Sequence, residues 1–127
     1  MTRVFFEDGF HGITKIGEQT LRIGEEQILP YDMTYGAIAS CLYSTFLDVL
    51  EENHLHVGKA IIDVHGVKRK TIPQTVENLF IHIQVESSDD LMQLRMAFAK
   101  AASRCSMVQT FAAVAEQIDM DLDLIEA

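Results

Sequence analysis

The sequence predicts an α+β fold, in which a mainly antiparallel β-sheet is combined with two long helices. Short apolar runs separated by glycines fill the first thirty residues, a pattern typical of antiparallel strands. Residues 59–70 and 76–86 alternate apolar and polar side chains with the period of a strand. Two other segments, one before and one after this pair, space their apolar residues as helices do.

The composition indicates a chain that can build one hydrophobic core. It has 127 residues, of which 48% are hydrophobic and 23% are charged, and a chain of this size buries roughly two thirds of its unfolded surface. We therefore expect a single domain over residues 1–127. Two cysteines are too few for a disulfide scaffold. We find no targeting or membrane-spanning segment, so we expect a cytoplasmic protein.

The net charge restricts the possible partners. It is −9 at pH 7, and the basic residues do not gather in a stripe. An acidic chain of this kind is repelled by phosphate backbones and by anionic lipid surfaces. We therefore expect neither a nucleic acid nor a membrane as a partner.

The N-terminal part predicts three strands and then a long helix. The strands are expected at residues 4–6, 13–16 and 20–23, with turns at the glycines between them. The helix is expected over residues 32–52, with Asp32 as a possible N-cap.

This helix is apolar on nearly all sides. Ile38, Leu42 and Phe46 share one face with Val49, and most of the remaining surface is also apolar. A helix with this pattern is buried all round, whereas a helix in a small domain usually keeps one wet face. We therefore expect an obligate homodimer, in which the helix is sandwiched between a sheet and a second subunit.

The remaining elements follow from similar patterns. Pro73 marks the connection between the two alternating strands. Ser87 or Ser88 is expected to cap a second helix, whose apolar stripe reaches Cys105 if the helix continues that far. A short helix over residues 106–115 and a strand over residues 118–124 complete the order β-β-β-α-β-β-α-α-β.

Cys41 and Cys105 are the candidate reactive residues. Free cysteines are most often small buried hydrophobic residues, and this is the simplest interpretation of both. A chemical role requires a thiolate, and because burial raises the pKa of a thiol, a nearby cation must lower it again. The arginines considered for this task are Arg3, Arg22, Arg95 and Arg104, and the sequence does not choose among them.

The residues around both cysteines resemble the motifs of the OsmC/Ohr family. Residues 30–41 read Pro-Tyr-Asp-Met-Thr-Tyr-Gly-Ala-Ile-Ala-Ser-Cys, and in the family a proline opens the helix about eleven positions before the first cysteine. Residues 104–108, Arg-Cys-Ser-Met-Val, are similar to the second motif. The 64-residue separation and the order of elements also match, so the resemblance covers essentially the whole chain. It is closer to the less characterised OsmC-like branch than to the organic hydroperoxide resistance enzymes.

The resemblance implies an OsmC-like intertwined homodimer that acts as a cysteine-based peroxidase in oxidative-stress defence. Cys41 would attack an organic hydroperoxide and become a sulfenic acid, and Cys105 would resolve it to a Cys41–Cys105 disulfide. A dithiol reductant would then restore both thiols. Neither a metal nor an organic cofactor is implied. Two alternatives stay open: a non-catalytic dimer that binds an apolar small molecule, and a cysteine redox sensor.

The chain departs from the peroxidase pattern at three places. Tyr31 stands where those members carry a glutamate after the helix-opening proline, and Phe10 or His11 stands where they carry an arginine. Ser106 replaces the proline that often follows the second cysteine. In the peroxidases the arginine and the glutamate together activate the thiolate.

The sequence offers only weak signals for a metal site. His54 and His56 could supply two nitrogens, with His65 or His82 as a third, but this spacing is generic and no carboxylate clearly completes a set. Residues 119–123 imitate the start of a calcium loop, yet Leu124 occupies the position that needs glycine. We expect no metal, and we expect residues 119–123 to be a strand with a solvated face.

Overall fold

The structure is a computed structural model that describes residues 1–126. It confirms the α+β class and the predicted order of elements. The chain divides into two compact units, Met1–Gly36 and Ala37–Ala127. The expectation of a single domain over residues 1–127 stays a prediction.

The first unit contains a three-stranded antiparallel sheet. Its strands β1 (Thr2–Phe6), β2 (His11–Ile16) and β3 (Gln19–Gly24) pair in the order β1-β2-β3. Gly24 ends the sheet where the backbone turns closely past Phe10. Its φ is +115°, and a Cβ there would lie 2.0 Å from the Phe10 carbonyl oxygen, so only glycine fits.

Helix α1 (Pro30–Glu52) begins in the first unit and continues through the second. It begins two residues before Asp32, so the prediction of Asp32 as the N-cap is wrong. Pro30 suits the first helical position, because the amide hydrogen that proline lacks would have no helical acceptor there. Asp32 instead lies in the first turn, where the helix dipole favours a negative charge.

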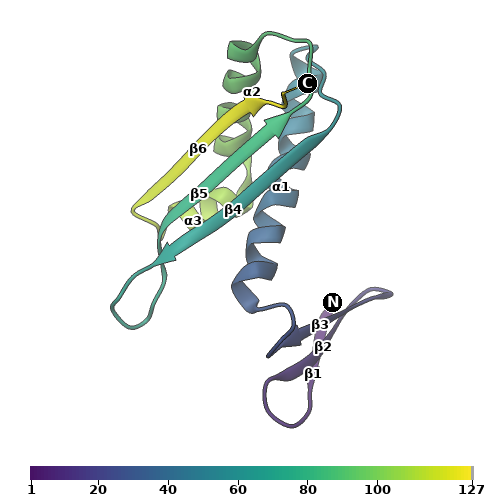
Figure 1. The fold of residues 1–127 in the computed structure, drawn as a ribbon, viewed down its shortest axis with the longest axis vertical. Helices are drawn as coiled ribbons and strands as arrows, with labels where there is room; N and C mark the ends of the chain where they lie inside the picture. The colour runs from purple at the N-terminus through teal and green to yellow at the C-terminus, as the bar shows by residue number, and fades with distance from the viewer. Residues whose placement is uncertain (127) are drawn as a thin grey trace. The chain divides into compact units, whose positions relative to one another are not determined.

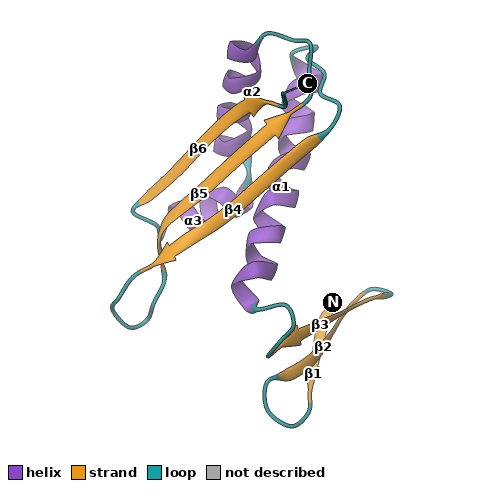
Figure 2. Ribbon diagram, viewed as in Figure 1, coloured by secondary structure: helices purple, strands orange, loops and turns teal. Residues whose placement is uncertain are grey.

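The second unit contains a three-stranded sheet of strands β4 (Ala60–Lys68), β5 (Val76–Val85) and β6 (Gln117–Leu124), in that order (Figure 2). Strands β4 and β5 are antiparallel, whereas β5 and β6 are parallel. The expected antiparallel arrangement therefore holds for three of the four strand pairings in the described chain. The parallel pairing arises because a helical crossover returns the chain to the same end of the sheet before β6 begins.

That crossover consists of helices α2 (Leu91–Arg104) and α3 (Ser106–Ala112). The N-cap of α2 is Asp90, whose carboxylate accepts a hydrogen bond from the Gln93 backbone N–H at 3.0 Å. The prediction of Ser87 or Ser88 as the cap is therefore wrong, and the Ser87 hydroxyl instead donates to the His56 carbonyl. Helix α3 ends at Ala112, before the expected end at residue 115.

The helices of the second unit lie on one face of its sheet, and this face forms the core (Figure 1). Strand β5 confirms the alternation seen in the sequence, since Leu79, Ile81, Ile83 and Val85 are at most 1% exposed. Phe46 of α1 meets Phe98 of α2 edge to face, with ring centroids 5.4 Å apart. Other buried side chains of the two helices are Ile38, Leu42, Val49, Leu50, Leu94, Ala97, Ala101 and Ala102.

Helix α1 is buried on one face only in the single chain. Ile38, Leu42 and Phe46 are fully buried, as predicted. Leu47, outside this face, is 44% exposed. In the described part of the chain, no helix has the length and apolar character needed to cross a membrane.

We expect Phe46→Ala to destabilise the protein by about 3–5 kcal/mol, because it removes a fully buried ring and leaves a cavity against Phe98. Urea unfolding followed by circular dichroism measures this loss. The control is Met92→Ala on α2, where the side chain is 60% exposed and should change stability by less than about 0.5 kcal/mol. Equal losses for the two variants would contradict the assignment of Phe46 to the core.

Candidate active site

The structure brings the two cysteines together. Cys41 lies in the middle of α1 and is half-buried, whereas Cys105 is fully buried. Their sulfurs are 3.3 Å apart, and the Cys105 thiol donates a hydrogen bond to the Cys41 sulfur. Both are free thiols. Residues 64 positions apart in the sequence therefore form one site.

Cys105 is placed by a break between two helices. It follows the last residue of α2 and precedes the first residue of α3, with an extended backbone (φ −73°, ψ 117°). Its N–H still donates to the Ala101 carbonyl at 2.8 Å, and its carbonyl accepts from the Gln109 N–H at 3.0 Å. The sequence predicts Cys105 on the apolar stripe of the second helix only if that helix continues to this residue. The chain instead turns at this residue, and its thiol is held against α1.

Cys41 is placed by the packing of α1 on α2. These helices run in opposite directions along the sheet (Figure 1). Cys41 lies just over one helical turn before Phe46, and Cys105 lies about two turns beyond Phe98, so the aromatic contact brings both thiols to a similar level. An ion pair also links the two helices: the Arg104 guanidinium donates to both carboxylate oxygens of Glu52 at 2.9 and 3.0 Å.

Hydrogen bonds make Cys41 the more acidic thiol. The backbone N–H of Met107 and then the thiol of Cys105 lower the pKa of Cys41, and partial burial opposes them. Ser106 lowers this pKa further through its hydroxyl, 3.9 Å from the sulfur, and through its own N–H. These donors stabilise the thiolate more than the thiol. Burial, in contrast, raises the pKa of the Cys105 thiol.

A nearby cation is the group expected to lower the pKa of a reactive thiol. Two of the arginines considered are engaged elsewhere: Arg104 binds Glu52, and Arg95 binds the Leu122 carbonyl and the Asp123 carboxylate. The groups that lower the pKa of Cys41 are instead backbone amides, a thiol and a hydroxyl. The sequence contained one signal for them, namely Ser106 in the place of a proline, because proline has neither an N–H nor a hydroxyl to donate.

The arrangement combines a reactive thiolate with a neutral thiol in contact with it. A thiolate is the nucleophilic form of cysteine. A neighbouring thiol can attack a sulfur that has been oxidised and close a disulfide with it. The geometry therefore suits two-step thiol oxidation chemistry.

Of the histidines predicted as weak metal candidates, His65 and His82 line one hollow on the sheet. His82 lies in β5, and within the described residues the grouping that could hold a metal ion is His82 with Asp121 and Asp123. His82 was one of the two histidines expected as a possible third ligand to His54 and His56, whereas the two aspartates were not anticipated. As predicted, residues 119–123 belong to a strand, β6.

We expect the Cys41 thiol to titrate at a lower pH in Cys105→Ser than in Cys105→Ala. Serine keeps an O–H donor beside the Cys41 sulfur, whereas alanine removes the donor. Each variant has only one thiol, so the pH dependence of iodoacetamide alkylation reports Cys41 alone. Identical titration midpoints would show that residue 105 does not donate to the Cys41 thiolate.

The whole chain has the fold of several solved structures. It matches an OsmC-like protein from Mycoplasma pneumoniae with a TM-score of 0.87 and 11% identity, over 99% of this chain and 96% of the other. It matches the organic hydroperoxide resistance protein OhrB of Bacillus subtilis with a TM-score of 0.71 and 12% identity, over 98% of each chain. It also matches an organic hydroperoxide resistance protein OsmC from Legionella pneumophila, with a TM-score of 0.72 and 16% identity, over 99% of this chain and 97% of the other.

At these identities the likeness establishes a shared fold. A comparison with curated proteins finds no match. The family model described as OsmC-like protein matches residues 24–120. This match covers most of the chain and includes both cysteines, so the protein belongs to the OsmC-like family.

Proposed function

We propose that this protein is a thiol-dependent peroxidase that reduces organic hydroperoxides in oxidative-stress defence. The supporting observation is the thiol pair. The sulfurs of Cys41 and Cys105 are 3.3 Å apart, and the pKa of the Cys41 thiol is lowered whereas that of the Cys105 thiol is raised. Membership of the OsmC-like family and the fold shared with hydroperoxide resistance proteins agree with this proposal.

In the first step, the Cys41 thiolate attacks one oxygen of the hydroperoxide O–O bond. An S–O bond forms and the O–O bond breaks, which gives a Cys41 sulfenic acid and an alkoxide that takes up a proton and leaves as an alcohol. Cys41 suits this role because it is the more acidic and the more accessible of the two thiols.

In the second step, Cys105 attacks the oxidised sulfur of Cys41. The S–S bond forms, and the hydroxyl of the sulfenic acid leaves as water with the thiol proton. A disulfide needs a sulfur–sulfur distance of about 2.05 Å, so only a small approach of the two side chains is required. A dithiol reductant then takes the disulfide back to two thiols and itself becomes a disulfide.

We expect wild-type protein to consume an organic hydroperoxide over many turnovers in the presence of dithiothreitol, and Cys41→Ser to lose this activity. The hydroperoxide remaining in solution is the measured quantity. In the absence of dithiothreitol, which would itself reduce a sulfenic acid, Cys105→Ser should undergo a single oxidation per chain, with the Cys41 sulfenic acid trapped by dimedone, because it lacks the resolving thiol.

Other outcomes favour the alternatives. A wild type that consumes no hydroperoxide while both thiols remain titratable would overturn the peroxidase and favour a dimer that binds an apolar small molecule. Oxidation to the disulfide without repeated turnover would favour a redox sensor.

We also propose that the functional unit is a homodimer in the cytoplasm. Several apolar side chains of α1 and of the first unit are exposed in the single chain, which is unfavourable in water. They include Phe5 at 61%, Phe6 at 48%, Leu29 at 48% and Leu47 at 44% exposure. A second copy of the chain could cover them.

The homodimer predicts that the wild type sediments as a dimer at micromolar concentration. Leu47→Glu should shift the protein towards the monomer, because a charge would then be buried at an apolar contact. The control is Met92→Glu, which places the same charge on the exposed surface of α2. A monomeric wild type would contradict the proposed dimer.

A further inference from the structure

The outer face of the β4-β5-β6 sheet carries a row of metal-ligating side chains. The strand register aligns Asp63 of β4, His82 of β5 and Asp121 of β6 side by side. Asp119 and Asp123 point to the same face as Asp121, because alternate residues of a strand share a face. This face is opposite the apolar side chains of β5 that pack against the helices (Figure 1).

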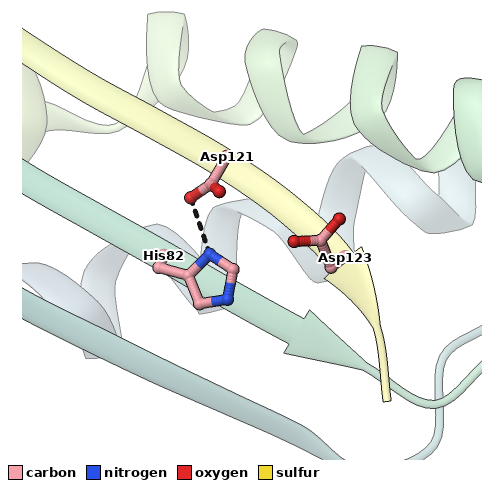
Figure 3. A group of neighbouring side chains, drawn as sticks. All are labelled: His82, Asp121 and Asp123. Carbon is pink, nitrogen blue, oxygen red and sulfur yellow. Dashed lines mark hydrogen bonds and ion pairs between the residues drawn. The ribbon is translucent and has the colours of Figure 1, made fainter. Parts of the chain in front are cut away.

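His82, Asp121 and Asp123 converge most closely within this row (Figure 3). One nitrogen of His82 and one carboxylate oxygen of each aspartate all lie within 4.8 Å of one another. His82 Nδ1 is 2.6 Å from Asp121 Oδ1. We propose that these three side chains form a binding site for a divalent first-row transition-metal ion.

The distances suit this ion with only small side-chain movements. A first-row ion binds histidine nitrogen and carboxylate oxygen at about 2.0–2.2 Å, so its ligands lie roughly 3–3.5 Å from one another. All three side chains are partly exposed, with 34% for His82, 65% for Asp121 and 49% for Asp123. His82 and Asp121 can therefore rotate towards an ion. The remaining coordination positions would be filled by water.

Neighbouring groups orient one ligand and set the charge around the site. Arg95 of α2 donates to one oxygen of Asp123 at 3.0 Å and holds that carboxylate in place, while the other oxygen is not used by this bond. Asp63 adds negative charge beside His82, and a hollow of about 470 Å³ is lined in part by Asp63, His82 and Asp121. An ion can reach His82 and Asp121 from this open side.

The donor set indicates which ions would bind. One imidazole nitrogen with two carboxylate oxygens suits borderline and hard ions such as Zn²⁺, Co²⁺ and Mn²⁺. Mn²⁺ is the useful probe, because it prefers nitrogen and oxygen ligands and so avoids the thiol pair. The proposal does not depend on the peroxidase function, since the thiols lie on the helices at the other face of the sheet.

The test measures Mn²⁺ binding to the full chain by electron paramagnetic resonance of the free ion. We expect His82→Gln and Asp121→Asn each to weaken binding by about tenfold or more, since each removes one of three ligands. Their matched controls are His65→Gln and Asp119→Asn, which change the same residue types on the same sheet face without touching the three ligands. The controls should weaken binding by less than about twofold.

Paramagnetic broadening locates the ion independently of the variants. In the wild type, the amide resonances of His82, Asp121 and Asp123 should broaden before those of the rest of the chain. The proposal is overturned if Mn²⁺ does not bind in a saturable manner, or if Asp119→Asn weakens binding as much as Asp121→Asn. The second result would mean that the ion is attracted by diffuse negative charge and not held by these ligands.

Discussion

The edge-to-face contact of Phe46 with Phe98 fixes how α1 lies on α2, and the thiol pair depends on that contact. Both rings are buried in the core against the sheet of the second unit. A slip of one helical turn between the helices would move the sulfurs apart by about 5 Å, which would remove both the hydrogen bond between them and any route to a disulfide. The packing of large apolar side chains therefore sets a distance on which the proposed chemistry relies.

The local environment of Cys41 shows how a thiolate can be stabilised by neutral donors. The amide of Met107, the thiol of Cys105 and the hydroxyl and amide of Ser106 all favour the charged form of Cys41. Neutral donors carry no full positive charge, so each supports a thiolate less than a guanidinium in contact with it would. By the resemblance to the family motifs, Tyr31 and either Phe10 or His11 stand at the positions of the glutamate and arginine expected in peroxidase members.

The sheet of the second unit lies between the thiol pair, which is on the side of the helices, and the His82–Asp121–Asp123 group on its outer face. Its inner face is apolar and is covered by the helices, so Cys105 is excluded from water and its pKa is raised. Its outer face carries Asp63, His82 and Asp121 in one cross-strand row that is open to solvent. Successive side chains of β5 point to opposite faces of the sheet, so this strand contributes apolar side chains to the inner face and His82 to the outer face.

Local patterns in the sequence determined the classes and approximate limits of the elements. The alternation over residues 76–86 predicted β5 and its buried side chains, and the apolar spacing over residues 32–52 predicted α1. The caps and the helix start were predicted less well, because neighbouring residues such as Ser87, Ser88 and Asp90 have similar capping ability and the surrounding contacts select among them.

Only the tertiary structure decided which residues meet. The family motifs marked Cys41 and Cys105 as a pair, but the break between α2 and α3 places the second sulfur against the first. The parallel pairing of β6 with β5 likewise brings Asp121 and Asp123 to His82. The periodicity of apolar and polar residues predicts which face of its own helix or strand a residue occupies. Contacts between distant residues depend on the path of the chain between them, and no local pattern contains that path.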